Sequence, residues 1–253
     1  MPKQEQNDKL LLAKTEDLFR LCEKYACVRF SDFLDGAEQA VIEDSGISRY
    51  GFNVMLFGGF KGSERKIMGV FPEWEEPCEA AFPIKALTIE SGIGRELNHR
   101  DYLGTFLSLG FDRSKTGDIV VDGKRAYALV CEDIADYIRN NISKIGSQGV
   151  KITVSDPAEI TVPEPKLQRI SAVCASMRLD AVTGAAAGVS RSNAAALIRG
   201  SKVQINHRLC EDVSKTVKEG DLLSIRGSGR FIASAVSGET RSGRIHIELL
   251  KYI

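Results

Sequence analysis

The sequence lacks any long apolar segment and any closely spaced pair of cysteines, and each absence excludes a class of protein. Its hydrophobic runs, such as Ala126–Cys131, are far shorter than the roughly 20 residues that a membrane-spanning helix needs. Residues 1–9 are polar and charged, and no apolar signal-peptide core follows them. The six cysteines are scattered without a C-x-x-C pair, which favours small buried hydrophobes over a zinc site. We therefore expect a cytoplasmic protein without membrane insertion.

Motifs for catalysis or phosphate binding are also missing. The three histidines lie far apart in the sequence, no serine or cysteine stands in a nucleophile motif, and no G-x-x-x-x-G-K-[ST] loop is present. His99–Asp101 matches a kinase catalytic loop, but Phe106 stands where that motif needs asparagine, so we interpret the segment as a helix start capped by Asn98. We expect no catalytic residue, no metal and no cofactor. A site assembled from distant residues stays an open alternative.

The zero net charge conceals an asymmetry along the chain. Residues 171–253 hold 12 Lys and Arg against 7 Asp and Glu, whereas residues 1–170 hold the remaining 22 basic and 27 acidic side chains. The C-terminal part thus carries a charge of +5 and the rest −5. A basic tail on an acidic body favours a polyanionic partner, although chance segregation could produce the same count.

Hydrophobic patterns and turn signals divide the chain into three parts. Residues 10–30 have helical spacing, a capping box at Asp35 and Glu38 opens a short helix over residues 37–44, and two strands over 53–57 and 66–71 flank a glycine-rich turn. Proline-containing linkers at 72–77 and 156–166 mark the boundaries. The predicted domains are 1–76, 77–165 and 171–253.

The middle part has the element order β-α-β-β-α-β. Its hairpin turns at Asp122-Gly123, and its second helix is expected to run from Glu132 to Ile145. This order predicts a ferredoxin-like (RRM-like) domain, so the whole chain is expected to be α+β. The strands lack the aromatic-rich stacking motif of many RNA-recognition domains, so the fold supports binding only weakly.

The third part begins with two helices and continues as strands. Ser176 and Ser190 are expected to cap the helices, and Gly188 and Gly200 to end them. Arg178 and Arg191 then stand at the two helix starts, where free backbone N–H groups and the positive dipole end would add to a phosphate-binding guanidinium. An antiparallel helix pair does not by itself place these arginines side by side. A solvated arginine face on a purely structural helix pair is the alternative.

The residues of this third part resemble a known family. The matching segments, in order and spacing, are those of the S4 (alpha-L) RNA-binding domain: Arg178-Leu179-Asp180, Ser190-Arg191-Ser192, Leu197-Ile198-x-Gly200, Val203-x-Ile205-Asn206 and Glu219-Gly220-Asp221. Further segments resemble the YlmH-like proteins: Phe33-Leu34-Asp35, Gly58-Gly59, Glu64-Arg65, His99–Gly104, Leu109-Gly110, Arg113, Gly117-Asp118-Ile119 and Arg226–Phe231. Two positions depart from the family pattern, Gly36 where proline is expected and His207 where glycine or an aromatic residue is usual.

The resemblance implies a three-part, non-enzymatic RNA-binding protein that engages the large ribosomal subunit and tRNA in rescue of stalled translation, a process of ribosome-associated quality control. We expect a monomer. The implied RNA-binding residues are Arg178, Ser190, Arg191, Ser192, Asn193, Arg199, Lys202, Asn206, Arg226 and Arg230.

Two other functions stay open. One is an S4-containing RNA-modifying enzyme with its site in the first 165 residues. The weak similarity of Arg178–Asp180 to a pseudouridine synthase motif is one residue short in spacing, and in those enzymes the S4 module precedes the catalytic domain. The other is an adaptor in cell division or photosystem assembly, to which family relatives are linked, with the acidic N-terminal half binding a protein.

Overall fold

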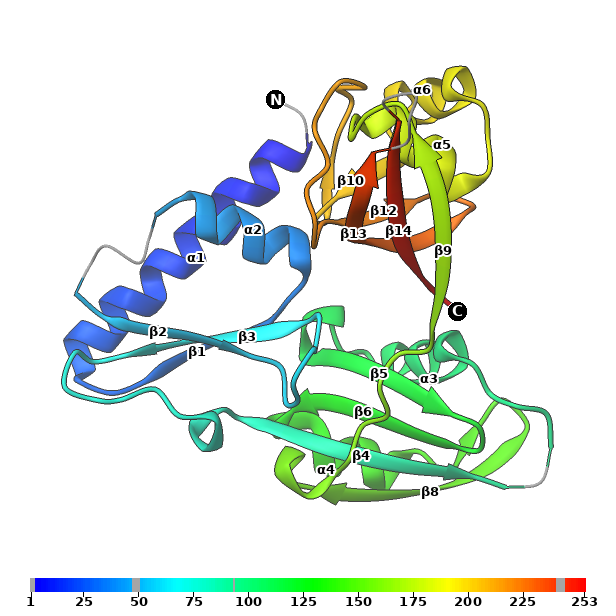
Figure 1. Cartoon of the computed structure of the whole chain (residues 1–253). Coiled ribbons are helices and arrows are strands. Elements are labelled where there is room, and N and C mark those ends of the chain that lie inside the picture. The colour runs from blue at the N-terminus through cyan, green and yellow to red at the C-terminus, as the bar shows by residue number, and fades with distance from the viewer. Residues whose placement is uncertain (1–2, 47–50, 93, 240–243) are drawn as a thin grey trace. The chain divides into compact units, whose positions relative to one another are not determined.

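Figure 1 shows the computed structural model of the chain, which describes residues 3–46, 51–92, 94–239 and 244–253. The fold is α+β, as predicted, and its strands form antiparallel sheets. The chain divides into two compact units, Met1–Pro163 and Glu164–Ile253. Among the helices of the described residues, none is long and apolar enough to cross a membrane.

The first unit begins with two helices packed on a three-stranded sheet of order β1-β3-β2. Apolar side chains of both helices meet Leu34, Met68 and Val70 of the sheet. The capping box at Asp35 is confirmed, since this carboxylate accepts hydrogen bonds from the first turn of the second helix and the Glu38 carboxylate accepts one from the N–H of Asp35. The elements are α1 (Lys3–Tyr25), β1 (Arg29–Leu34), α2 (Gly36–Asp44), β2 (Asn53–Phe57) and β3 (Lys66–Phe71).

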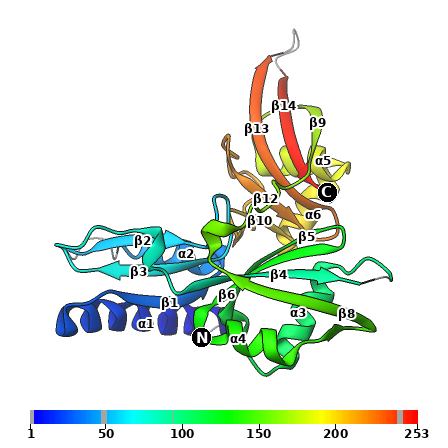
Figure 2. The ribbon, with the colours of Figure 1, turned by 90° about the horizontal axis from the view of Figure 1, so that it is seen from below.

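The rest of the first unit is the ferredoxin-like domain, and this prediction is confirmed. Its sheet has the order β5-β6-β4-β8-β7. Strand β6 lies between β4 and β5, and β4 lies between β6 and β8, which is the strand order of a split β-α-β arrangement. Both helices lie on one face of the sheet (Figure 2). The elements are β4 (Ile84–Ser91), α3 (His99–Ser108), β5 (Thr116–Asp122), β6 (Arg125–Cys131), α4 (Glu132–Asn141), β7 (Lys144–Ile145) and β8 (Gln148–Ser155).

Two details of this domain differ from the expectation. The second helix ends at Asn141 and not at Ile145, because the chain turns back at Gly146, whose φ is +59°, and pairs β7 with β8. The hairpin between β5 and β6 pairs Asp122 with Arg125, so its loop residues are Gly123 and Lys124, one position later than predicted.

The free face of the ferredoxin-like sheet contacts the N-terminal sheet, so the two predicted domains share a core. A Cβ atom at Gly117 would lie 2.6 Å from the Phe33 ring, and one at Gly59 would lie 2.6 Å from the Leu129 side chain. Glycine is therefore required at both positions for the sheets to approach this closely. The boundary drawn at residue 76 stays a prediction, within a region that the structure forms as one compact unit.

The second unit is a six-stranded sheet of order β11-β10-β12-β13-β14-β9, with two helices on one face. Figure 2 shows its long β13–β14 hairpin with β9 beside it. The elements are β9 (Leu167–Cys174), α5 (Leu179–Ala187), α6 (Arg191–Arg199), β10 (Val203–Ile205), β11 (Arg208–Leu209), β12 (Leu222–Ile225), β13 (Gly229–Glu239) and β14 (Ile245–Tyr252). β9 begins four residues before the predicted start of the module.

The turn between β10 and β11 explains the departure at His207. Ile205 pairs with Arg208, so Asn206 and His207 form a two-residue hairpin loop. Their φ angles are +48° and +66°, which is the left-handed region that asparagine tolerates and that glycine adopts most easily. The glycine usual in the family fits this backbone, and histidine holds the same conformation at some cost.

Candidate nucleic-acid interface

Arg178 and Arg191 lie side by side because both bind one buried carboxylate. Asp180 accepts hydrogen bonds from Nε and Nη2 of Arg191 at 3.0 and 3.2 Å, and from Nε and Nη2 of Arg178 at 3.3 Å each. Its side chain is 8% exposed, whereas those of Arg178 and Arg191 are 39% and 53% exposed. The two guanidinium groups therefore share an anchor inside the protein and present their outer edges to solvent.

The electrostatics of this triad leave one positive charge in excess. Burial acts to raise the pKa of Asp180, but the hydrogen bonds and charges of Arg178 and Arg191 outweigh it and hold the pKa below its ordinary value. A guanidinium has five N–H donors, and the two that face the carboxylate leave three on each arginine. The pair can thus donate to phosphate oxygens without releasing its anchor.

The start of α5 differs from the prediction in two ways. Ser176 does not cap the helix, since the N-cap residue is Arg178 and it makes no side-chain cap. The N–H groups of Leu179 and Asp180 are not free, because they donate to the carbonyls of Lys215 and Val213. The loop that carries these carbonyls packs against the start of α5, which therefore contributes one arginine and its carboxylate anchor rather than open N–H groups.

The start of α6 agrees with the prediction. The Ser190 hydroxyl accepts a hydrogen bond from the N–H of Asn193 and lies 3.0 Å from the Ser192 hydroxyl. Ser190, Ser192 and Asn193 are exposed next to Arg191. Arg199 lies two turns after Ser192 on the same helix face, roughly 10 Å along the axis by the rise of an α-helix. These residues extend the arginine pair into a polar strip.

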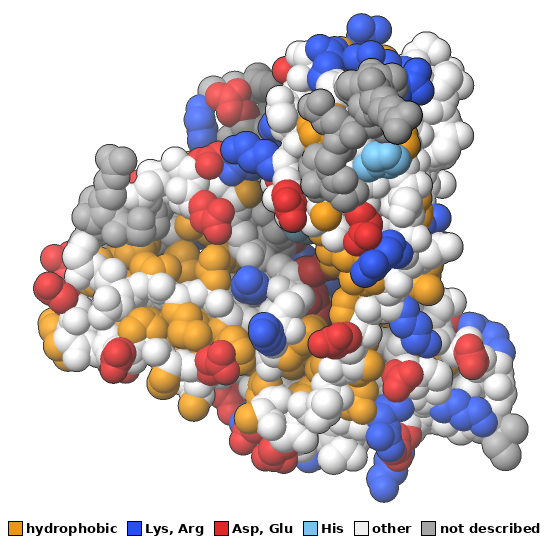
Figure 3. Space-filling model, in the orientation of Figure 1, with side chains coloured by type: hydrophobic (Ala, Val, Ile, Leu, Met, Phe, Trp, Pro, Cys, Tyr) orange, Lys and Arg blue, Asp and Glu red, His pale blue; other side chains and the backbone are white. Residues whose placement is uncertain are grey.

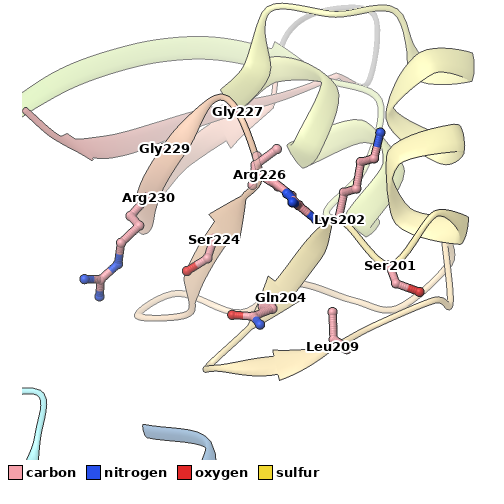
Figure 4. A pocket seen from close by; sticks show the side chains of 10 residues that line it. Ser201, Lys202, Gln204, Leu209, Ser224, Arg226, Gly227, Gly229 and Arg230 are labelled. Atoms are coloured by element: carbon pink, nitrogen blue, oxygen red, sulfur yellow. The ribbon is translucent and has the colours of Figure 1, made fainter. Parts of the chain in front are cut away.

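Lys202, Arg226 and Arg230 gather elsewhere, on the sheet. They line a groove of about 610 Å³ whose floor includes Gln204 and Ser224 (Figure 4). Leu223 and Ile225 alternate with these positions and are buried under the helices, so the groove is on the opposite face of the sheet. The predicted residues thus separate into a helix-start set and a sheet set.

Asn206 belongs to neither set. Its side-chain amide donates to Asp221 at 2.8 Å and accepts from the N–H of Leu222 at 2.9 Å. Asp221 in turn accepts from the N–H of Lys218. Both ends of the amide are therefore engaged in holding the loop before β12, which favours a structural role over RNA contact for Asn206.

Sequence reasoning missed three residues that the structure places in the arginine pair or in the groove. Asp180 was quoted as part of a motif, but its role as the shared anchor depends on burial by residues more than 30 positions away. Gln204 and Ser224 are ordinary polar strand residues, and only the pairing of their strands brings them together.

A second carboxylate with two arginines lies inside the first unit. Asp118 accepts from the N–H groups of Glu64 and Arg65 at 2.5 and 3.2 Å. Arg65 donates to the carbonyls of Thr116 and Phe33, and Arg113 donates to the carbonyl of Thr116. Burial raises the pKa of Asp118, and burial next to Arg65 lowers the pKa of Arg113 to about 10. This cluster joins the two sheets of the unit, which gives the N-terminal and middle family motifs a structural explanation.

His99–Asp101 is a helix start, as interpreted from the sequence. Asn98 caps α3 and Asp101 completes the capping box while binding Arg95 at 2.7 Å. The hydrogen bonds with Arg95 and the N–H of Asn98 hold the pKa of Asp101 at about 2. The Asp101 carboxylate is thus engaged in capping the start of α3 and in holding Arg95.

Comparison with known families supports the division seen in the structure. A model described as "Putative RNA-binding domain in YlmH" matches residues 77–159, which span the ferredoxin-like domain. The S4 domain model matches residues 177–223, from the start of α5 into β12. The chain carries a YlmH-type domain followed by an S4 domain. The resemblance noted from the sequence is confirmed, and Asp180, Arg178 and Arg191 fall within the S4 match.

Two relatives extend this comparison. The chain is 29% identical over 226 residues to "Ribosome-associated protein quality control protein P2" of Bacillus subtilis (strain 168), an alignment that covers 89% of this chain and 88% of the relative. It is also similar in structure to "Cell division protein ylmH from Streptococcus pneumoniae", with a TM-score of 0.51 and 21% identity, covering 60% of this chain and 93% of the other. At this identity the second likeness concerns the fold alone.

Proposed function

We propose that this protein binds structured RNA of the ribosome through its S4 domain, in the cytoplasm and without catalysis. The observation that carries the proposal is the pair of guanidinium groups that Asp180 holds together at the surface. Two preorganised arginines bind a phosphate backbone without losing further side-chain entropy. The excess of basic residues in the C-terminal part adds a long-range attraction for RNA.

The finer proposal is that the RNA is that of the large ribosomal subunit together with tRNA, during rescue of stalled translation. It is supported by the name of the Bacillus subtilis relative, which aligns over most of both chains. Mapping of crosslinked RNA in cells tests it: the expected contacts are in the rRNA of the large subunit and in tRNA. Crosslinks confined to messenger RNA would contradict the ribosomal assignment.

The binding mode is tested by cosedimentation with large ribosomal subunits. Arg178→Ala and Arg191→Ala are each expected to weaken binding and to lower the slope of log K against log salt by about one, because each removes one phosphate contact. The matched control is Arg139→Ala, an exposed arginine of α4 that also pairs with a carboxylate, Asp136 at 3.2 Å. If both S4 variants bind as tightly as wild type, the arginine pair is not the RNA contact.

A second candidate function, a protein adaptor, is favoured by one surface loop. Trp74 is 75% exposed in the acidic segment Pro72–Pro77. The Asn53 side chain donates to the carbonyls of Glu73 and Glu75, which fixes the loop. Figure 3 shows apolar side chains at the surface over the three-stranded sheet, with acidic ones beside them. A fixed, exposed tryptophan among carboxylates suits a basic protein partner and disfavours RNA.

The adaptor function is tested by capture of partners after ribonuclease treatment. A partner that survives ribonuclease with wild type and is lost with Trp74→Ala would support it. Leu10→Ala, another exposed apolar residue, serves as the control. The remaining alternative, an RNA-modifying enzyme, predicts a changed modification profile of rRNA and tRNA in a deletion strain, which mass analysis detects.

A further inference from the structure

A row of polar and aromatic side chains crosses the S4 sheet beneath the groove. Gln204 pairs with Ser224, and Ser224 pairs with Arg230 on the next strand. The register Phe231 to Lys251 places Arg230 opposite Tyr252. The row therefore uses one residue from each of four adjacent strands, and all four side chains project from the face turned away from α5 and α6.

One end of the row is a cation–π pair. The Arg230 guanidinium lies over the Tyr252 ring, 4.9 Å from its centroid. A tyrosine ring with an arginine over it is the kind of platform on which proteins hold an unpaired base. Arg230 therefore contacts the Tyr252 ring and also lines the groove.

The other end of the row offers hydrogen bonds. The Gln204 amide has both donors and an acceptor, and the Ser224 hydroxyl can act as either. Figure 4 shows these side chains with Arg230 on neighbouring strands of the groove. A base lying on Arg230 and Tyr252 would direct its edge towards Gln204 and Ser224.

A second, parallel row supplies positive charge. The N–H of Arg226 donates to the carbonyl of Lys202 at 2.9 Å, so these two residues are neighbours at the rim, two residues along the chain from Gln204 and Ser224 and on the same face. The residues lining the groove include three cations and no carboxylate. The turn at Gly227, with φ of +89°, brings no side chain into the rim, so a phosphate can approach closely.

We propose that this groove holds one unpaired nucleotide of the bound RNA, with its base on Arg230 and Tyr252, its base edge at Gln204 and Ser224, and its phosphate at Lys202 and Arg226. The volume of about 610 Å³ is within the roughly 300–1,000 Å³ of small-ligand pockets. The inference rests on the proposed RNA-binding function and adds a substrate class to it: a duplex with an adjoining unpaired nucleotide.

The test compares binding of the full chain to a blunt RNA duplex and to the same duplex with a single-nucleotide 5′ or 3′ overhang, by fluorescence anisotropy. Wild type is expected to bind one overhang duplex about tenfold more tightly than the blunt one, the scale of stacking one base. Arg230→Ala and Gln204→Ala should reduce this ratio towards one. Tyr252→Phe should keep it, because the ring remains.

His246→Ala is the matched control, since His246 is exposed on the same strand and face as Tyr252 and six residues from it. Equal binding of blunt and overhang duplexes by wild type overturns the proposal, and so does an unchanged ratio in Gln204→Ala and Arg230→Ala. If Arg230→Ala does not fold, Gln204→Ala decides. Arg191→Ala separates the helix-start contact from the groove, because it should weaken binding of both duplexes equally. If it leaves binding of both unchanged while wild type still prefers the overhang duplex, the helix-start contact is refuted and the groove is not.

Discussion

The two units of this protein each contain a carboxylate flanked by two arginines, and the two clusters direct their guanidinium donors differently. Around Asp118, the arginines Arg65 and Arg113 point their donors at backbone carbonyls inside the unit. Around Asp180, the arginines lie over the carboxylate and keep their outer edges in solvent. The two carboxylates also have pKa shifts of opposite sign: burial raises the pKa of Asp118, whereas the two arginines lower the pKa of Asp180.

The difference gives a criterion that separates an arginine whose donors are used inside the fold from one whose donors are open to a ligand. Both clusters contain the same side chains, and both fall in segments that resemble one family. What differs is the destination of the guanidinium hydrogens. Donors consumed by carbonyls hold the fold together, whereas donors left beside a satisfied carboxylate are available to phosphate.

The largest effect is expected for Asp118→Ala. This variant leaves the N–H groups of Glu64 and Arg65 without their acceptor and removes the charge beside two half-buried arginines. We expect a loss of about 3 kcal/mol in the free energy of unfolding, measured by urea denaturation. Asp180→Ala should cost less, because its arginines can turn to water. Equal losses would remove the distinction between the clusters.

Arg65→Ala and Arg191→Ala are expected to affect different measurements: the first the free energy of unfolding, the second the salt slope of RNA binding. Arg65→Ala should lower the free energy of unfolding by about 1–3 kcal/mol through lost hydrogen bonds to carbonyls, with an unchanged salt slope of RNA binding. Arg191→Ala should change stability by less than about 1 kcal/mol and reduce the salt slope by about one. A reduced salt slope in folded Arg65→Ala would show that the inner cluster also meets RNA.

Asp180→Asn distinguishes positioning from simple charge. If Asp180 only neutralised the arginines, its removal would add a positive charge and tighten RNA binding. Because it aligns them, we expect binding to weaken by about three- to tenfold at physiological salt, the scale of roughly 1 kcal/mol of lost preorganisation. Filter binding with a structured rRNA fragment measures the change, and tighter binding would contradict the anchoring role.

The smallest expected effect is a pH dependence of opposite sign at the two carboxylates. Since the pKa of Asp180 is lowered, its contribution to stability is present above the ordinary value of about 4 and is lost as pH falls. The difference in free energy of unfolding between wild type and Asp180→Asn should therefore become smaller below about pH 4. Since the pKa of Asp118 is raised, wild type should gain stability relative to Asp118→Asn as pH falls. If urea titrations showed the same direction of change with pH for Asp180→Asn and Asp118→Asn, the two carboxylates would not differ in this respect.

Local signals predicted much of the fold. The strands Asn53–Phe57 and Lys66–Phe71 have the predicted bounds because alternation and a glycine-rich turn mark both ends. The caps at Asp35, Asn98 and Ser190 are confirmed for the same reason, since each acts within one helical turn. β1 was missed, because its sequence Arg29–Leu34 is interrupted by polar residues and forms a strand only against β3.

The parts of the site that could not be predicted depend on distant pairing. The sequence placed Arg178 and Arg191 at helix starts, but only the buried Asp180 brings them together. The groove combines residues of strands β10, β11, β12 and β13, and Tyr252 of β14 adjoins it through Arg230; no local pattern specifies the register of these strands. Four of the six cysteines are buried as expected, while Cys27 and Cys78 are exposed.

The pairing of β9 with β14 has a consequence for how a new copy of the protein matures. These strands are joined along their whole length, yet about 70 residues separate Cys174 from Ile245 in the chain. Because synthesis runs from the N-terminus, β9 cannot pair with β14 until the last residues of the chain have been synthesised. A copy whose translation stops before Ile245 would possess both arginines of the helix pair but not Tyr252. On the two proposals made above, such an incomplete product would keep the residues for the phosphate contact and lack one of those for base stacking.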